Sequence, residues 1–243
     1  MMSWAEQKKN EDKPKGPDDF FKPVKELEQT SGMKVMVFGD SKVGKTYFSL
    51  TFPPPIFVVD TEMGSKKVAD IHFKGKEIKV FETLALDPNS DQADPIRSID
   101  QAEQSLLSLG KLEGNEGTIV IDSITDIWLW IQQWLDTVAK KRTKDNNQPY
   151  RFEWTKAQKR FRNIIMRLLT KPQHMVLCAQ TQEKYDSGKA SGTYVPHSYR
   201  QSPHWVDYLI RIAKAADLTQ KPPKTVYEAT LAECRFSRTL DMK

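Results

Sequence analysis

The chain of 243 residues carries a formal net charge of +5, with 38% hydrophobic and 28% charged residues, a balance that excludes a globally disordered protein. Its two cysteines, Cys178 and Cys234, are too few for a disulfide framework or a four-thiolate zinc site, which favours a reducing compartment. No stretch approaches the ~20 apolar residues of a membrane span, so we expect a cytoplasmic protein without membrane contacts.

Composition divides the chain into an N-terminal arm and one domain. Residues 1–30 mix Lys, Glu, Asp, Pro and Gly with few apolar residues, so we expect a flexible arm whose apolar anchor is Phe20-Phe21. Residues 31–243 carry the patterns of a folded domain. Short runs rich in Val and Ile predict strands buried on both faces of a parallel sheet, at Lys34–Phe38, Ile56–Asp60, Ile78–Phe81, Thr118–Asp122 and Met175–Ala179.

Helical patterns lie between these strands. Apolar residues at steps of three and four predict amphipathic helices over Ile124–Val138 and Trp154–Leu168. A further helix is predicted from Pro95 to Gly110, because Asp94 can cap its start and a glycine follows its last turn. Strands that alternate with helices predict a three-layer α/β domain built on a mostly parallel sheet.

The C-terminal part of the chain departs from this alternation. Glu183–Pro203 contains glycines and many Ser and Tyr residues without periodicity, so we expect a long mobile loop, a feature that is often functional. Trp205–Ala213 and Thr225–Phe236 are predicted strands that extend the sheet in antiparallel fashion, with Pro222-Pro223 in the turn between them.

A phosphate-binding motif follows the first predicted strand. The pattern Gly-x-x-x-x-Gly-Lys-Thr, the P-loop or Walker A motif, is matched by Gly39-Asp40-Ser41-Lys42-Val43-Gly44-Lys45-Thr46. In such loops backbone N–H groups surround the β-phosphate, the lysine bridges β- and γ-phosphate oxygens, and the threonine hydroxyl binds Mg²⁺. We expect the motif, together with Tyr47, to bind a nucleoside triphosphate and Mg²⁺.

A carboxylate that holds the water shell of the metal should end a buried strand beside this loop. Asp122 ends such a strand and is the predicted Walker B residue, although it could instead cap the next helix. Recognition of guanine is disfavoured. Asp60–Gly64 is one residue too long for the Asp-x-x-Gly of small GTPases, and Glu183–Asp186 lacks the asparagine of Asn-Lys-x-Asp. We therefore expect ATP.

Hydrolysis requires a group that orients or deprotonates the attacking water. Two predicted strands separate Lys45 from Asp122 along the chain, a spacing that fits ATPases with an extra strand between the Walker A and Walker B strands. Glu62, which follows the strand Ile56–Asp60, is the candidate catalytic carboxylate.

With these motifs the chain resembles the RecA-type recombinase superfamily, and within it compact single-domain ATPases of phages and archaea, some of which anneal single strands. Over roughly residues 32–236, the resemblance implies a RecA-like core. The superfamily's catalytic glutamate follows a string like Val-Asp-x-Glu, which Val59-Asp60-Thr61-Glu62 matches. The resemblance also implies a glutamine that senses the γ-phosphate at the end of the next core strand. Gln180 holds that place, and Gln182 is the second choice.

Oligomerisation is a further implication of the resemblance. Members of the superfamily form rings or filaments, and Phe20–Val24 is a loose analogue of the aromatic hook that links their protomers. A neighbouring protomer often adds a cation to the site, for which Arg235 and Arg238 are candidates. A single-strand-binding protein is an additional expected partner.

Two cation-rich segments match the DNA-facing loops of that superfamily. Eleven Lys and Arg residues lie between Val138 and Lys171 against two acidic residues. The first segment contributes Lys140, Lys141, Arg142, Lys144 and Arg151, and the second, with several tyrosines, contributes Lys189 and Arg200. Cations neutralise phosphates, and aromatic faces stack unpaired bases at ~1–3 kcal/mol each. We expect an ATPase that acts on single-stranded DNA in recombination, annealing or repair. The alternative is that these cations only keep a helix face solvated.

Two other function classes stay open. A P-loop motor of another kind, such as a helicase or a packaging motor, usually needs more domains than 243 residues allow. A nucleotide-dependent regulator would use ATP without significant hydrolysis to order the mobile loop.

Overall fold

The computed structural model describes residue 23 and residues 32–89, 93–142, 149–186, 188–217, 219 and 224–236, without the side chains of 141 and 142. The chain divides into two units, Met1–Thr30 and Ser31–Lys243. The predicted flexible arm and its Phe20-Phe21 anchor lie outside the described residues. The second unit contains the sheet, the helices and the P-loop.

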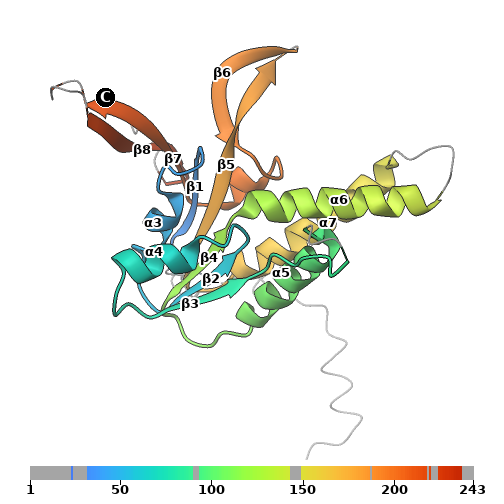
Figure 1. Cartoon of the computed structure of the whole chain (residues 1–243), viewed down its shortest axis with the longest axis horizontal. Coiled ribbons are helices and arrows are strands. Elements are labelled where there is room, and N and C mark those ends of the chain that lie inside the picture. The colour runs from blue at the N-terminus through green and yellow to red at the C-terminus, as the bar shows by residue number, and fades with distance from the viewer. Residues whose placement is uncertain are drawn as a thin grey trace, which may run out of the picture. The chain divides into compact units, whose positions relative to one another are not determined.

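The described part of the second unit is organised by an eight-stranded sheet (Figure 1). In chain order the strands are β1 Lys34–Gly39, β2 Ile56–Asp60, β3 Ile78–Glu82, β4 Thr118–Asp122, β5 His174–Asp186, β6 Lys189–Pro196, β7 Tyr208–Asp217 and β8 Lys224–Cys234. They lie in the order β3-β2-β4-β5-β1-β7-β8, and β6 pairs with β5. Neighbours from β3 to β7 are parallel, whereas β8 and β6 run antiparallel to their partners.

This topology confirms the predicted fold class and adds one detail. The sheet is mostly parallel, and the C-terminal pair β7 and β8 is antiparallel, as expected. However, β7 itself continues the parallel part, because Val35 in β1 aligns with Tyr208 and Phe38 with Arg211. The strand between the P-loop strand β1 and the Walker B strand β4 is β5, so the inserted strand predicted from the spacing is present.

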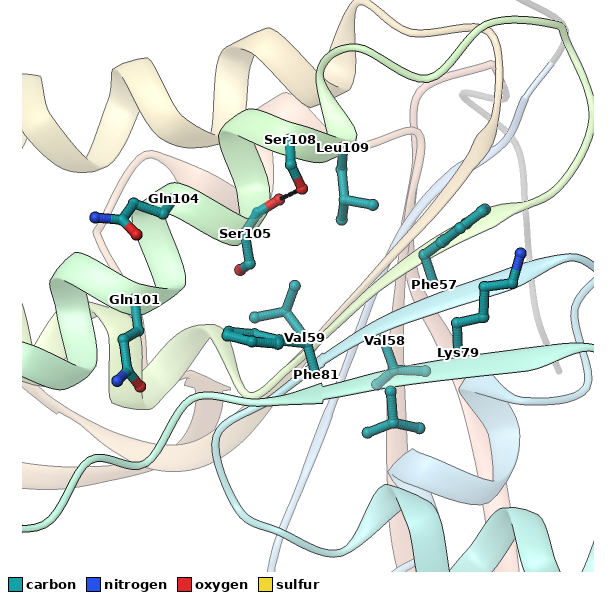
Figure 2. A pocket seen from close by; sticks show the side chains of 11 residues that line it. Phe57, Val58, Val59, Lys79, Phe81, Gln101, Gln104, Ser105, Ser108 and Leu109 are labelled. Carbon is teal, nitrogen blue, oxygen red and sulfur yellow. Dashed lines mark hydrogen bonds between the residues drawn. The ribbon is translucent and has the colours of Figure 1, made fainter.

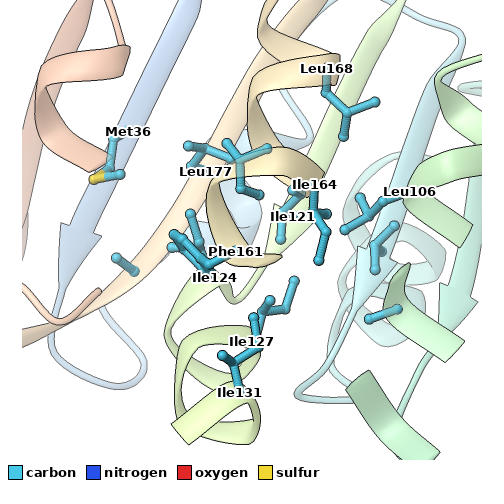
Figure 3. Packing of buried hydrophobic residues seen from close by; sticks show 14 of the residues in the cluster. Met36, Leu106, Ile121, Ile124, Ile127, Ile131, Phe161, Ile164, Leu168 and Leu177 are labelled. Atoms are coloured by element: carbon cyan, nitrogen blue, oxygen red, sulfur yellow. The ribbon is translucent and has the colours of Figure 1, made fainter. Parts of the chain in front are cut away.

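Helices cover both faces of the sheet (Figure 1). They are α3 Lys45–Ser49, α4 Ser65–His72, α5 Pro95–Leu109, α6 Ile124–Arg142 and α7 Arg151–Leu169. One apolar core joins α5, α6 and α7 to the sheet; Figure 3 shows Phe161, Ile164 and Leu168 of α7 packed near Ile121 and Leu177. A second core lies under α3 and α4. No helix within the described residues has the length and apolarity needed to cross a membrane.

The boundaries of α5 follow the predicted signals, whereas the start of α7 does not. Asp94 caps α5, since its Oδ1 accepts hydrogen bonds of 3.0 Å from the backbone N–H groups of Ile96 and Arg97. Proline occupies the first turn of α5, where the missing N–H costs nothing. α7 begins at Arg151, three residues earlier than predicted, so Arg151 belongs to a helix rather than to a DNA-facing loop.

The prediction of a long loop over Glu183–Pro203 is wrong. β5 continues to Asp186 and pairs with β6 to form a projecting hairpin (Figure 1), in which Asp186 lies opposite Lys189. Gly188 in the turn has a φ of 81°, a conformation that glycine adopts readily. Most side chains of the hairpin are exposed on both faces, so its strands lack the apolar alternation from which strands are recognised. A 3₁₀ turn, η2 Ser202–Trp205, precedes β7.

Candidate nucleotide-binding site

The phosphate loop connects β1 to α3, as the motif requires. Gly39 must be glycine, because a Cβ there would overlap the backbone oxygen of Ile212 in the neighbouring strand β7. Gly44 has a φ of 98°, in the region that side chains disfavour. Between these glycines, Asp40, Ser41 and Lys42 are exposed, and Val43 is buried in the core below the loop.

Lys45 lies folded into this loop. Its side-chain Nζ donates hydrogen bonds to the backbone oxygens of Gly39 at 3.0 Å and Asp40 at 2.8 Å, and the residue is 6% exposed. These carbonyls hold the ammonium group over the curve of the loop. A bound nucleotide would offer phosphate oxygens to this ammonium group in place of the two carbonyl oxygens.

Thr46 and Asp122 bring the loop and the end of β4 together. The Thr46 hydroxyl donates a hydrogen bond of 2.6 Å to Oδ2 of Asp122, while Oδ1 is buried without a partner in the described part of the chain. Burial raises the pKa of Asp122 to about 7, although the bond from Thr46 opposes the rise. A hydroxyl beside a carboxylate with a free buried oxygen suits Mg²⁺, a hard cation that takes oxygen ligands. No side-chain bond from Asp122 to the start of α6 supports the helix-cap alternative within the described residues.

Glu62 follows β2 on a turn that Asp60 organises. The buried carboxylate of Asp60 accepts hydrogen bonds from the backbone N–H of Glu62 at 3.0 Å and from that of Ser65 at 2.7 Å. The side chain of Glu62 is left exposed. It lines a hollow of about 410 Å³ together with Lys45, Thr46 and other P-loop residues.

The side chain of Gln180, in β5, contacts that of Glu62. Its Nε2 donates a hydrogen bond of 3.2 Å to Oε1 of Glu62. Its backbone N–H donates to the Thr125 hydroxyl at 2.9 Å, and that hydroxyl donates to the backbone oxygen of His197 at 2.7 Å. Thr125 thereby connects the two strands at the base of the β5–β6 hairpin. The alternative residue Gln182 points elsewhere, with its amide 3.5 Å from the backbone oxygen of Pro196.

A polar network that the sequence did not reveal joins the ends of β2 and β4. The Thr61 hydroxyl donates to Oδ2 of Asp126 at 2.6 Å and accepts from the backbone N–H of Ser123 at 2.7 Å. The Ser123 hydroxyl also donates to Asp126, at 3.0 Å. Burial raises the pKa of Asp126, although the hydrogen bonds from Thr61 and Ser123 act to lower it. The available signal was the pair of polar residues Ser123 and Asp126, where the apolar strand β4 passes into the amphipathic helix α6.

The outer wall of the nucleotide hollow is aromatic. Tyr47, 48% exposed, packs against His72 and Phe73 with ring centroids 5.3 and 5.1 Å away. Tyr47, Val68 and His72 line the same hollow as the P-loop and Glu62. The spacing of His72 in the sequence predicts only a structural or surface residue; its position on α4 reveals that it borders the site.

Comparison with known proteins decides the family. Residues 31–238 match the AAA domain family, which is most of the chain. The chain belongs to the AAA domain family. With its P-loop between β1 and α3 and its strand order, this AAA domain is a P-loop ATPase of RecA-like fold. No curated protein matches it.

Among solved structures, the AAA domain is similar to a prototypical ATPase from the type III secretion system of pathogenic bacteria. The TM-score is 0.47 and the sequence identity is 11%. The match covers 75% of this chain and 51% of that ATPase, so the chain spans about half of that protein's length.

The predicted DNA-contacting residues of the AAA domain come from separate elements. Lys140 is exposed near the end of α6, Arg151 begins α7, Lys189 begins β6, and Arg200 follows β6. Lys144 and the side chains of Lys141 and Arg142 lie outside the described residues, as does Arg238. Arg235 contacts its own chain, with Asp207 at 3.3 Å and the backbone oxygen of His204 at 2.8 Å.

A second hollow of the AAA domain lies away from the P-loop. It has a volume of about 360 Å³ and lies between α5 and the strands β2 and β3, of which β3 is the edge of the sheet (Figure 2). Figure 2 shows Phe57 and Phe81 of the strands lining it opposite Gln101, Gln104 and Leu109 of α5. It holds none of the predicted site residues. Within the described residues, no cluster of His, Cys, Asp and Glu side chains fits a metal ion.

Proposed function

We propose that this ATPase hydrolyses Mg²⁺-ATP and acts on single-stranded DNA in recombination, annealing or repair. The observation that carries the proposal is the contact between Glu62 and Gln180. It joins the carboxylate expected to activate water to the strand that continues into the exposed β5–β6 hairpin. The nucleotide site is therefore linked through β5 to the segment predicted to bind DNA.

The residues around the P-loop suit phosphoryl transfer to water. In the proposal Lys45 neutralises β- and γ-phosphate oxygens, and Thr46 and Asp122 hold Mg²⁺, which supplies charge neutralisation on those oxygens. Glu62 accepts a proton from water as the water oxygen attacks the γ-phosphorus and the bond to the β-phosphate oxygen breaks. Gln180 donates a hydrogen bond near the γ-phosphate. Tyr47 borders the nucleotide beyond the loop.

DNA enters the proposal through exposed cations and rings on the hairpin. Lys189 and Tyr185 are exposed near its tip, and Tyr185 is 68% exposed. Tyr194 of β6 lies 4.6 Å from the guanidinium of Arg211 in β7. Cations with exposed aromatic faces favour single strands over duplexes, because only unpaired bases offer their faces for stacking.

Assembly is also part of the proposal. We expect copies of the chain to form a ring or a filament and to cooperate with a single-strand-binding protein, as the resemblance to RecA-type proteins implies. Analytical ultracentrifugation with a non-hydrolysable ATP analogue tests the first of these. Sedimentation as a monomer with both nucleotide and DNA present would contradict it.

The decisive experiment is ATP turnover, measured alone and with saturating single-stranded or duplex DNA at low salt. We expect single strands to raise the rate and duplexes to have a smaller effect. Equal turnover in all three conditions would contradict the DNA role. Directional strand displacement would instead favour a helicase or packaging motor, and nucleotide binding without turnover would favour a regulator.

A further inference from the structure

The outer face of α7 carries an elongated hollow that the ATPase site does not use. One part, about 560 Å³ in volume, is lined by residues that include Thr155, Lys159, Arg162 and Tyr199. The adjoining part, about 620 Å³, is lined by Tyr150, Arg151, Phe152 and again Thr155, so the two parts meet at Thr155. We call this hollow the α7 groove. At ~1.5 Å per residue, the helical stretch from Arg151 to Met166 is about 22 Å long.

The charge along the α7 groove has one sign. Glu153 is the acidic residue of α7; it is 6% exposed, and its carboxylate accepts a hydrogen bond from the backbone N–H of Tyr150 at 2.7 Å. Arg160 is turned toward α5, where it pairs with Asp100 and Glu103. The remaining cations of α7 are exposed, namely Arg151, Lys156, Lys159, Arg162 and Arg167. Among the residues that line the α7 groove, the charged ones are Arg151, Lys159 and Arg162, and all three are cations.

Aromatic rings accompany these cations. Tyr150 and Phe152 stack at the start of α7, with centroids 5.7 Å and planes 23° apart, and they are 42% and 57% exposed. Tyr199 forms part of the side wall, and its ring is fixed against Phe161 and Trp205 at 5.9 and 5.6 Å. Rings that are ordered yet accessible, next to cations, are the arrangement on which unpaired bases stack while their phosphates are neutralised.

We infer that the α7 groove is the track along which single-stranded DNA lies between the two segments that the sequence assigns to DNA. It runs from Arg151, at the α6–α7 end, to Tyr199, which precedes Arg200 after the hairpin. The inference rests on the proposed function and deepens it by assigning phosphate contacts to Lys159 and Arg162, which the sequence does not single out. Phe152 is assigned a stacking role.

The test compares two double variants of the full chain. Lys159→Gln with Arg162→Gln removes two cations from the groove, and Lys67→Gln with Lys111→Gln removes two exposed cations from α4 and from the turn after α5. Binding of fluorescein-labelled oligothymidylate is measured by anisotropy over a range of salt concentrations, with a non-hydrolysable ATP analogue present. Circular dichroism checks that each variant folds.

The groove variant is expected to bind the oligonucleotide about tenfold more weakly at low salt. Its slope of log affinity against log salt should fall by about 1.4, since each neutralised phosphate of a single strand contributes ~0.7. The control variant should match the unmodified protein. Phe152→Ala should also weaken binding, whereas Phe152→Tyr, which keeps a ring, should not.

The outcomes separate the inference from the proposed function. If the unmodified protein binds the oligonucleotide and both double variants bind equally well, the α7 groove is not the track, although the proposed function stands. If a labelled duplex of the same length binds the unmodified protein as tightly as oligothymidylate does, the preference for unpaired DNA is overturned. If the unmodified protein binds no single strand, the proposed function fails and the inference fails with it.

Discussion

The side-chain amide of Gln180 donates a hydrogen bond of 3.2 Å to the carboxylate of Glu62, across 118 residues of sequence. Each residue is assigned to the γ-phosphate end of the site from a different string of sequence. The two assignments can be tested separately. Glu62 is expected to act on the attacking water, whereas Gln180 is expected to couple the hairpin to the nucleotide site.

Glu62→Gln is expected to lower kcat by about 10²–10⁴-fold, the usual contribution of a general base. ATP affinity should stay within about threefold, because Lys45 and Thr46 hold the phosphates. Turnover is measured by phosphate release and affinity by displacement of a fluorescent ATP analogue. Lys45→Ala, which should lose binding itself, is the contrasting variant. Normal hydrolysis by Glu62→Gln would remove Glu62 from its catalytic role.

Gln180→Ala should leave basal turnover within about fivefold of the unmodified protein and abolish its stimulation by single-stranded DNA. The reason is that Gln180 lies in β5 between Glu62 and the exposed hairpin, so a shift of the hairpin reaches the carboxylate through it. The measurement is the ratio of turnover with and without oligothymidylate. Gln182→Ala, two residues along the same strand, should retain the ratio; if both variants lose it equally, the contact is not the route.

Replacement of Asp122 is expected to change the pH dependence of stability. The folded carboxyl has a pKa of about 7 against an ordinary value of 3.8, so the folded chain holds the proton more tightly than the unfolded chain. The stabilisation from this group is complete at low pH and is lost as pH rises through about 7. Asp122→Asn should therefore raise the Tm of the nucleotide-free protein more at pH 8 than at pH 5. Calorimetry that finds equal shifts at both values would contradict the raised pKa.

Binding of Mg²⁺-ATP should expel the proton from Asp122, because the metal needs the ionised carboxylate. Because this pKa is raised to about 7, part of the nucleotide-free molecules carry the proton at neutral pH, and binding should release a fraction of a proton. Titration calorimetry in two buffers with different heats of ionisation measures the release. Asp122→Asn should release no proton on binding. In a separate assay, removal of Mg²⁺ with a chelator should abolish ATP turnover. A release that the Asn variant shares would locate the proton on another group.

The Thr61–Asp126 hydrogen bond is expected to position Glu62 relative to Asp122. Asp126→Ala leaves the Thr61 and Ser123 hydroxyls without their acceptor and should lower kcat about tenfold or more, with little change in ATP affinity. Asp126→Asn keeps an acceptor oxygen and should recover much of the rate. Equal losses in both variants, or a matching loss of ATP affinity, would indicate a structural role instead.

The sequence predicted the parts of the fold that are buried. Ile56–Asp60 and Thr118–Asp122 are strands with the predicted bounds, because their side chains meet apolar neighbours on both faces. The P-loop, Asp122 and Glu62 could be proposed as site residues because phosphate chemistry restricts which residues can follow these strands.

The exposed and the long-range features could not be predicted in the same way. The sequence around Gly188 predicts a loop where the structure has a hairpin, since solvent on both faces removes the alternation that marks a strand. The network of Thr61, Ser123 and Asp126 depends on β2 lying beside β4, which no local pattern encodes. The α7 groove likewise needs Tyr199 to fold back onto a helix that lies far earlier in the chain.

The missing side chain of Gly39 has a mechanical consequence. Because the backbone of Ile212 occupies the space that a methyl group would need, the phosphate loop and the ribbon of β7 and β8 are in backbone contact. A shift of the loop on binding a triphosphate would therefore press on the ribbon through backbone atoms, without an intervening side chain.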